Sequence, residues 1–156
     1  MSYLSKVLII IFLTFASVAN ASNNSFVGVI GAAIGDIKNQ KNESLSNGSK
    51  IFFGDTIISK SKSNAQILFL DQTVLTLGEE TELTIDEFVY DPNSQDGSFV
   101  STVKTGTVKF ITGQISKKNP DNLEVKVPAG TLGARGTEFV VLSENNNEST
   151  VVLLGP

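Results

Sequence analysis

Short runs of apolar and β-branched residues alternate with polar positions along most of the chain, separated by clusters of Gly, Asn, Asp and Ser. This pattern predicts short strands bounded by turns. The runs lie at 26–34, 50–53, 56–59, 65–70, 73–77, 82–86, 99–105, 106–112, 123–127, 137–142 and 150–154. No helical period of useful length follows residue 21. We therefore expect an all-β fold of about ten short, mostly antiparallel strands in a sandwich- or roll-like domain.

The first residues follow a different pattern. Lys6 supplies a positive charge, an apolar run extends from Val7 to about Val18, and Ala19-Asn20-Ala21 has the small residues of a cleavage site. This arrangement predicts a signal peptide over residues 1–21, cut after Ala21, and a periplasmic or secreted protein. The alternative is an uncleaved anchor, but the apolar run is shorter than the roughly 20 residues that span a membrane. We expect no stable membrane span after cleavage.

Removing 21 of the 156 residues leaves 135, enough for one domain with a core. We expect residues 22–49 to form an N-terminal strand and a polar turn of this domain, and residues 50–156 to form its main part. The last strand stops at Gly155-Pro156 without a polar tail. Two readings remain open: a domain cut short at its last hairpin, or a piece of a longer gene product.

Composition narrows the chemistry. The chain has no Cys and no His, which excludes Ser-His-Asp triads, Cys nucleophiles and His or thiolate metal sites. The formal net charge of −4 becomes −5 once Lys6 is removed, and no basic stripe is present. Such a surface repels phosphates, so no nucleic acid partner is expected. We expect no catalytic residues, no metal and no cofactor, although a carboxylate pair of the glycosidase type remains a minor alternative.

An acidic stretch without any Lys or Arg is a candidate calcium site, because oxygen-rich loops bind this ion. Its acids are Glu79, Glu80, Glu82, Asp86, Glu87, Asp91 and Asp96. Residues 91–97 resemble the start of an EF-hand loop, but Gln95, Gly97 and Thr102 do not fit the required positions. We therefore expect a solvated acidic face.

Arg135 is the only arginine and follows a Gly-rich segment containing Gly130 and Gly133. One reading is a fork for an anionic ligand beside a nest of backbone amides. The reading we favour is structural, with Arg135 bonded to carbonyl groups or to an acid such as Asp86 or Glu138.

Exposed strand edges are a further candidate site, because a partner strand can pair with them. Four lysines could instead guard such edges against association. They are Lys104, Lys109, Lys117 and Lys118.

Several segments together resemble the FecR-type domain over roughly residues 28–155. They are Gly54-Asp55-Thr56-Ile57, the run 65–78, Ile85-Asp86-Glu87-Phe88-Val89-Tyr90-Asp91-Pro92, Phe110-Ile111-Thr112-Gly113-Gln114-Ile115, Val127-Pro128-Ala129 and the run 131–137. Two positions depart from the family pattern, namely Ala134, where a branched apolar residue is usual, and Gln72, where Gly is common. We call the motif positions the signature residues and expect them to be structural: Gly54, Asp55, Asp71, Asp86, Phe88, Tyr90, Asp91, Pro92, Gly113, Gly133, Arg135, Gly136 and Thr137.

The resemblance implies a function as well as a fold. FecR-type proteins of iron-transport signalling combine a cytoplasmic anti-sigma segment, one membrane helix and a periplasmic all-β module. With a signal peptide at the start, the anti-sigma role is not expected here. The resemblance implies an exported, non-catalytic sensing or protein-interaction module of the bacterial envelope, whose partner is another envelope protein. The alternatives are a surface-matrix or adhesin-type structural module and, less favoured, a carbohydrate-active enzyme.

Overall fold

The computed structural model describes residues 25–133, 138–144 and 147–155, so the expected signal peptide lies outside the described residues. Within these residues twelve strands form, together with one short α-helix and one 3-10 turn. The strands are β1 (Phe26–Ile34), β2 (Ile37–Asn39), β3 (Lys50–Phe52), β4 (Thr56–Ser59), β5 (Asn64–Phe69), β6 (Val74–Leu77), β7 (Glu82–Tyr90), β8 (Gly97–Ile111), β9 (Leu123–Val127), β10 (Gly130–Gly133), β11 (Glu138–Ser143) and β12 (Ser149–Gly155). The helix α1 spans Gln114–Lys118, and the 3-10 turn spans Pro120–Asn122.

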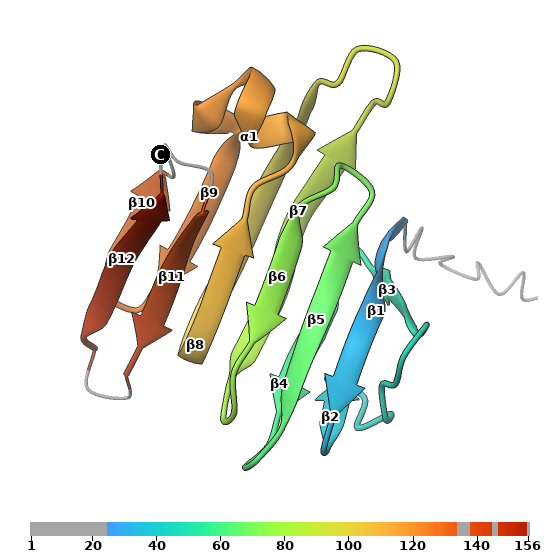
Figure 1. Cartoon of the computed structure of the whole chain (residues 1–156), viewed down its shortest axis with the longest axis vertical. Coiled ribbons are helices and arrows are strands. Elements are labelled where there is room, and N and C mark those ends of the chain that lie inside the picture. The colour runs from blue at the N-terminus through green and yellow to red at the C-terminus, as the bar shows by residue number, and fades with distance from the viewer. Residues whose placement is uncertain (1–24, 134–137, 145–146, 156) are drawn as a thin grey trace, which may run out of the picture.

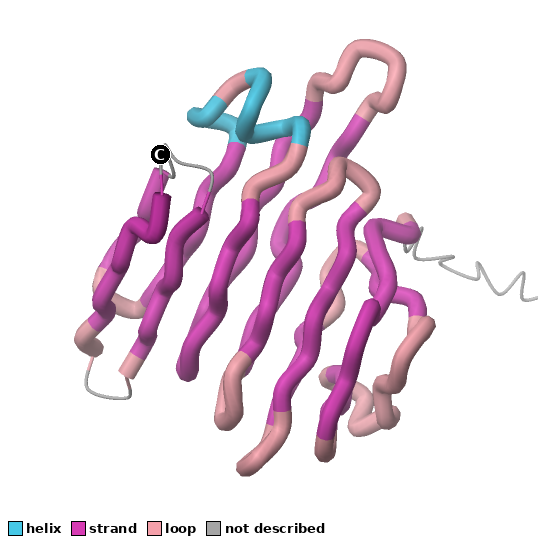
Figure 2. Tube along the Cα trace, in the orientation of Figure 1, coloured by secondary structure: helices cyan, strands magenta, loops and turns pink. Residues whose placement is uncertain are grey.

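The strands form two facing layers of one curled sheet (Figure 1). The front layer has the order β3-β1-β5-β6-β8-β11-β12, and the second layer has the order β2-β4-β7-β8-β9-β10. All neighbouring strands are antiparallel except β8 and β9, which are parallel. Helix α1 and the 3-10 turn lie over one end of the layers, and the rest of the described chain is strand and loop (Figure 2). The all-β fold predicted from the sequence is confirmed.

Strand β8 belongs to both layers. Its first part pairs with β7 and β9 in the second layer, and its last part, from Gly106, pairs with β6 and β11 in the front layer. Gly106 has a φ of 89°, which only glycine adopts without strain. A Cβ at this position would also lie 2.5 Å from Cα of Thr81. Gly106 thus lets one strand bend from one layer into the other.

The core lies between the two layers and follows from the alternation of the sequence. Apolar residues at every second position of a strand point to one face, and that face is turned inward here. Burial of each large side chain stabilises the fold by about 1.5–3 kcal/mol. The largest fully buried side chains are Phe99, Phe110, Phe139, Ile30, Ile37, Ile51, Ile57, Ile67, Leu75, Leu77, Leu83 and Ile85.

The structure differs from the predicted strands mainly in four places. Strand β7 extends to Tyr90, four residues beyond the predicted run 82–86. The predicted strands 99–105 and 106–112 are one strand, β8, because Gly106 bends the chain without ending the pairing. The polar segment expected to be a turn contains β2, which is held by pairing with β4. Strand β10 was not predicted, and it forms by pairing with β9.

Candidate functional site

The signature residues Gly54 and Asp55 form the turn between β3 and β4. One oxygen of the Asp55 carboxylate accepts a hydrogen bond from the backbone N–H of Phe52 at 2.9 Å, and the other accepts one from the Gln40 amide at 3.2 Å. The backbone groups of Gly54 and Asp55 also bond both polar groups of Ile85 on β7. This turn therefore joins β3 of the front layer to β7 and to the segment after β2 in the second layer.

Asp71 is fully buried and holds the turn between β5 and β6. Its carboxylate accepts hydrogen bonds from the backbone N–H of Thr73 at 3.0 Å, from the Thr73 hydroxyl at 2.8 Å, and from the backbone N–H of Ile115 at 3.4 Å. Its backbone carbonyl accepts one from Gln114 at 2.7 Å. A buried carboxylate is stabilised by several donors of this kind, and these bonds fix α1 to the turn.

Gly113 packs directly against this turn. A Cβ on Gly113 would collide with the backbone oxygen of Asp71 and the backbone nitrogen of Thr73. The absence of a side chain lets the Gly113 N–H reach the Thr73 hydroxyl at 3.0 Å. Glycine is thus required here by close approach of two backbone segments.

The signature residues at the end of β7 are divided between its faces. Asp86 accepts a hydrogen bond from the Thr102 hydroxyl at 2.6 Å on the neighbouring strand. Phe88 is buried in an aromatic cluster, with its ring centroid 5.4 Å from Phe69 and 5.3 Å from Phe99. Tyr90 is partly buried against the core.

Asp91 and Pro92 open the loop between β7 and β8. The carboxylate of Asp91 accepts hydrogen bonds from the backbone N–H of Asn93 at 2.9 Å and from the Ser94 hydroxyl at 3.0 Å. The backbone N–H of Asn93, followed by the Ser94 hydroxyl, lowers the pKa of Asp91 below its ordinary value of 3.8. The carboxylate therefore stabilises an Asx turn.

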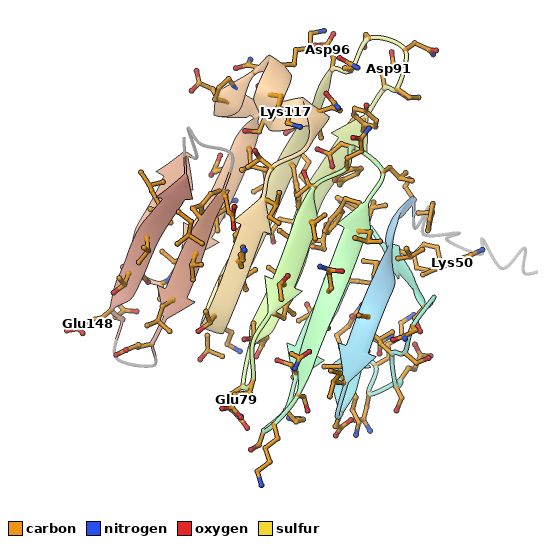
Figure 3. The ribbon with its side chains drawn as sticks, in the orientation of Figure 1. Lys50, Glu79, Asp91, Asp96, Lys117 and Glu148 are labelled. Carbon is orange, nitrogen blue, oxygen red and sulfur yellow. The ribbon has the colours of Figure 1, made fainter. Side chains whose placement is uncertain are left out.

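The helix α1 closes over the same loop. The Lys118 ammonium group bonds Asp96 at 2.7 Å and the backbone carbonyl of Ser94 at 2.7 Å. Asp91 and Asp96 lie at the tip of this loop, with Lys117 of α1 at the same end of the molecule (Figure 3). The oxygen atoms of this loop thus already accept hydrogen bonds from donors within the loop and from the Lys118 ammonium group. No cluster of three or more metal-ligating side chains is found in the part of the chain that the structure describes.

Gly133 ends β10, and a Cβ built on it would meet no atom of the described residues within 4 Å. Arg135, Gly136, Thr137 and the departure at Ala134 lie outside the described residues. The two acids considered as partners of Arg135 both have other contacts, since Asp86 bonds Thr102 and Glu138 forms an ion pair with Lys109.

The lysines do not guard the sheet edges, contrary to one of the readings of the sequence. Lys104 and Lys109 lie on β8, which is paired on both sides, and they form ion pairs with Glu82 and Glu138. Lys118 is bound to the β7–β8 loop from α1. Their spacing along the sequence did not reveal that β8 is a central strand.

Exposed apolar side chains gather around a surface hollow of about 250 Å³ near the start of β1. We call this site the aromatic hollow. It is lined by Ser25, Phe26, Leu70, Phe88, Val89 and Tyr90. Phe26, Leu70 and Val89 on its rim are exposed, whereas Phe88 is buried beneath them.

The floor of the aromatic hollow is rigid, because Phe88 belongs to the cluster with Phe69 and Phe99, whose centroids lie 4.7 Å apart. The walls are tied by a backbone hydrogen bond of 3.0 Å from Leu70 to Val27. A hollow of this size lies below the roughly 300–1,000 Å³ of small-molecule pockets. It fits one or two apolar side chains of a protein partner.

Sequence reasoning missed the rim of this hollow. Phe88 and Tyr90 were signature residues, but Phe26, Leu70 and Val89 come from three distant strands or turns. A signal did exist in Val89, which lies between two inward-facing aromatic residues and so points outward. A second hollow, of about 400 Å³, is lined by Lys62, Ser63, Asn64, Gly78 and Glu79, and it lacks an apolar floor.

The fold and these contacts define an all-β, two-layer module whose signature carboxylates bond backbone and side-chain donors and whose exposed apolar residues gather at its surface. A family model described as FecR protein matches residues 55–155. The chain therefore belongs to the FecR family. The matched region begins at residue 55, whereas the resemblance of the sequence motifs reached back to residue 28. No curated protein and no solved structure matches the chain. In the described residues, no helix combines the length and apolar character needed to cross a membrane.

Proposed function

We propose that this chain is an exported, non-catalytic sensing module that binds another protein of the bacterial envelope through the aromatic hollow. The observation that carries the proposal is the position of Phe88 and Tyr90. These two residues of the FecR motif line a hollow whose rim is apolar and exposed. Membership of the FecR family supports a role in signalling.

The partner expected is a protein that inserts an apolar or aromatic side chain. Such anchors supply most of the binding energy of an interface when they fill a preformed pocket. The aromatic floor and the hydrogen-bonded walls mean that the hollow needs little reordering when it binds, which lowers the entropic cost.

Matched variants test this binding site. Val89→Asp places a charge on the rim, whereas Ile34→Asp makes the same change at a residue of nearly equal exposure on β1, 63% against 61%. The full chain would be expressed, and the protein would be purified in whatever form the cell leaves it after any cleavage. The purified protein would then be used to capture envelope proteins. A partner that binds the purified protein directly should be lost with Val89→Asp and kept with Ile34→Asp. Equal binding by both variants would refute the hollow as the site.

Export is tested separately. Residues 1–21 carry the pattern of a signal peptide, so cell fractionation should place the protein outside the cytoplasm, with Ser22 at its N-terminus by intact mass. A cytoplasmic protein that keeps Met1 would refute export while leaving the binding test valid.

A further inference from the structure

Strand β12 ends the front layer and exposes a continuous apolar run. It pairs with β11 on one side, and among the described residues no strand pairs with its other side, which we call the free edge. The exposed run is Val151, Val152, Leu153 and Leu154. Leu153 is 68% exposed, the largest fraction among the exposed large apolar side chains that the structure describes. Exposed apolar edges promote association.

Part of this run belongs to the inner face of the sandwich. Val151 lies opposite Val141, and Leu153 lies opposite Phe139, whose side chains point into the core. Residues directly opposite each other in neighbouring strands share a face. Val151 and Leu153 are thus inward-facing residues that the described chain covers only in part, with 40% and 68% of their surface exposed, while Val152 lies on the outer face.

The second layer ends at the same side of the molecule. Strand β10 lies two strands beyond β8, as β12 does in the front layer, and both appear at the same side in Figure 1. Leu132 of β10 lies opposite the buried Val125 and packs against the core from this end. Among the described residues both layers therefore end here beside an apolar interior.

Neither of these end strands carries a charge. The sequences Ser149–Gly155 and Gly130–Gly133 contain no Lys, Arg, Asp or Glu. Natural edge strands that stay unpaired are usually protected by charged residues, proline or a bulge. The pairing of β12 with β11 is regular from Ser149 to Leu153, and its bulge lies only at the end, between Leu153 and Gly155. Glu148 precedes β12 and lies at the far end of the strand (Figure 3). The central part of the free edge is thus suited to a close, uncharged contact.

We propose that two copies of this chain pair through β12, antiparallel and around a two-fold axis at Val152. In this register Val151 of each copy lies opposite Leu153 of the other, so inner-face residues meet inner-face residues. Because β12 has no charged residue, two copies of this acidic chain can approach along it without placing like charges opposite each other. A single added peptide strand would extend only the front layer, whereas a second sandwich also brings its own β10 and covers both layers.

The size of the contact predicts a weak dimer. Seven residues at about 3.4 Å each give a free edge about 24 Å long, and two layers about 10 Å apart with their outer side chains are about 20 Å across. The area is thus on the order of 500 Å² per copy, or about 1,000 Å² in total, the lower limit for a specific interface. We expect dimers that form at high concentration and dissociate on dilution. This inference goes beyond the proposed function and does not involve the aromatic hollow.

Sedimentation of the processed protein over a concentration series tests the dimer. The mass should rise toward that of two copies, and Val152→Lys should raise the dissociation constant by at least about tenfold by placing two lysines opposite each other. Ile34→Lys, the matched control at an exposed β1 position, should leave it unchanged. Mixing Val152→Lys with Val152→Glu should restore pairing, which only a two-fold contact at this residue predicts. Dimers that persist in Val152→Lys would overturn the proposal.

A cysteine probe gives a second measurement, because the chain has no native cysteine. Paired residues of antiparallel strands have Cα atoms about 4.5–5.5 Å apart, within the range that a disulfide spans. Val152→Cys should form a disulfide-linked dimer under mild oxidation, and Ile34→Cys should not. Circular dichroism confirms that each variant folds. A protein that stays monomeric up to about 1 mM, with Val152→Cys remaining a free thiol, would refute the dimer. Val89→Asp changes the aromatic hollow and leaves β12 intact, so this variant should dimerise normally. Failure of the proposed dimer and failure of the proposed binding site are therefore distinguishable.

Discussion

The backbone N–H of Gly113 donates a hydrogen bond of 3.0 Å to the hydroxyl oxygen of Thr73, forty residues earlier in the chain. That hydroxyl in turn donates to the buried carboxylate of Asp71 at 2.8 Å. The three residues connect the β5–β6 turn to the junction between β8 and α1. All three residues are buried, so water cannot replace a hydrogen-bond partner that is removed from this chain of bonds. The remaining polar groups would then be left unsatisfied.

Asp71→Asn should destabilise the fold by about 2 kcal/mol. The amide keeps the shape of the carboxylate, but its NH₂ group faces donors that the carboxylate oxygen accepted, so at least one bond is lost. Urea denaturation measures the change in the free energy of unfolding. Asp36→Asn, at an exposed site, should change it by less than about 0.5 kcal/mol. Equal stability of the two variants would show that the buried bonds contribute nothing.

Gly113→Ala should cost about 2–4 kcal/mol, because the added Cβ collides with the backbone of Asp71 and Thr73. The matched control is Gly133→Ala, where a Cβ meets no atom of the described residues within 4 Å. Thermal unfolding should show a large fall in Tm for the first variant and almost none for the second. A tolerated Gly113→Ala would mean that the two segments can separate without loss.

Gln72→Gly should stabilise the protein by about 0.5–1 kcal/mol. Gln72 has a φ of 71°, a left-handed conformation that costs non-glycine residues about 1–2 kcal/mol. Part of the gain is offset by the greater freedom of glycine in the unfolded chain. Gln72→Ala removes the same side chain without relieving the backbone, so it should not stabilise. A gain with alanine in the same denaturation assay would contradict a backbone cause.

Ser94→Ala should raise the pKa of Asp91 partway toward its ordinary value of 3.8, because it removes the side-chain donor and keeps the Asn93 N–H. The folded pKa lies below the unfolded value. Asp91 thus stabilises the folded state above pH 3.8, and this contribution is lost as the pH falls through the folded pKa. Carboxyl NMR titration of both proteins measures the shift. An unchanged pKa would indicate that the hydroxyl bond does not persist in solution.

Sequence reasoning located most reliably the strands that are bounded by clear turn residues. Strands β1, β4 and β9 begin and end at the predicted residues. It failed at β2 and β10, because these short strands are held by neighbours and have little pattern of their own. Gly106 was read as the start of a separate strand, since a glycine that bends a continuing strand has the same local signal as one in a turn.

The candidate sites were harder to predict because they depend on which segments meet. The FecR motif located Phe88 and Tyr90, but Phe26 and Leu70 join them only through the pairing of β1 with β5. Lys104 and Lys109 were misread as possible edge guards, because strand order is not local information.

The double membership of β8 also has a consequence for how the chain folds. Without residues 97–111, the earlier strands form two fragments, β3-β1-β5-β6 and β2-β4-β7, that share no strand. A chain made or transported from its N-terminus must therefore wait for β8 before one strand links the two fragments into a single sheet. Such non-local pairing folds slowly, and the unfinished half leaves its apolar faces open to aggregation until β8 arrives.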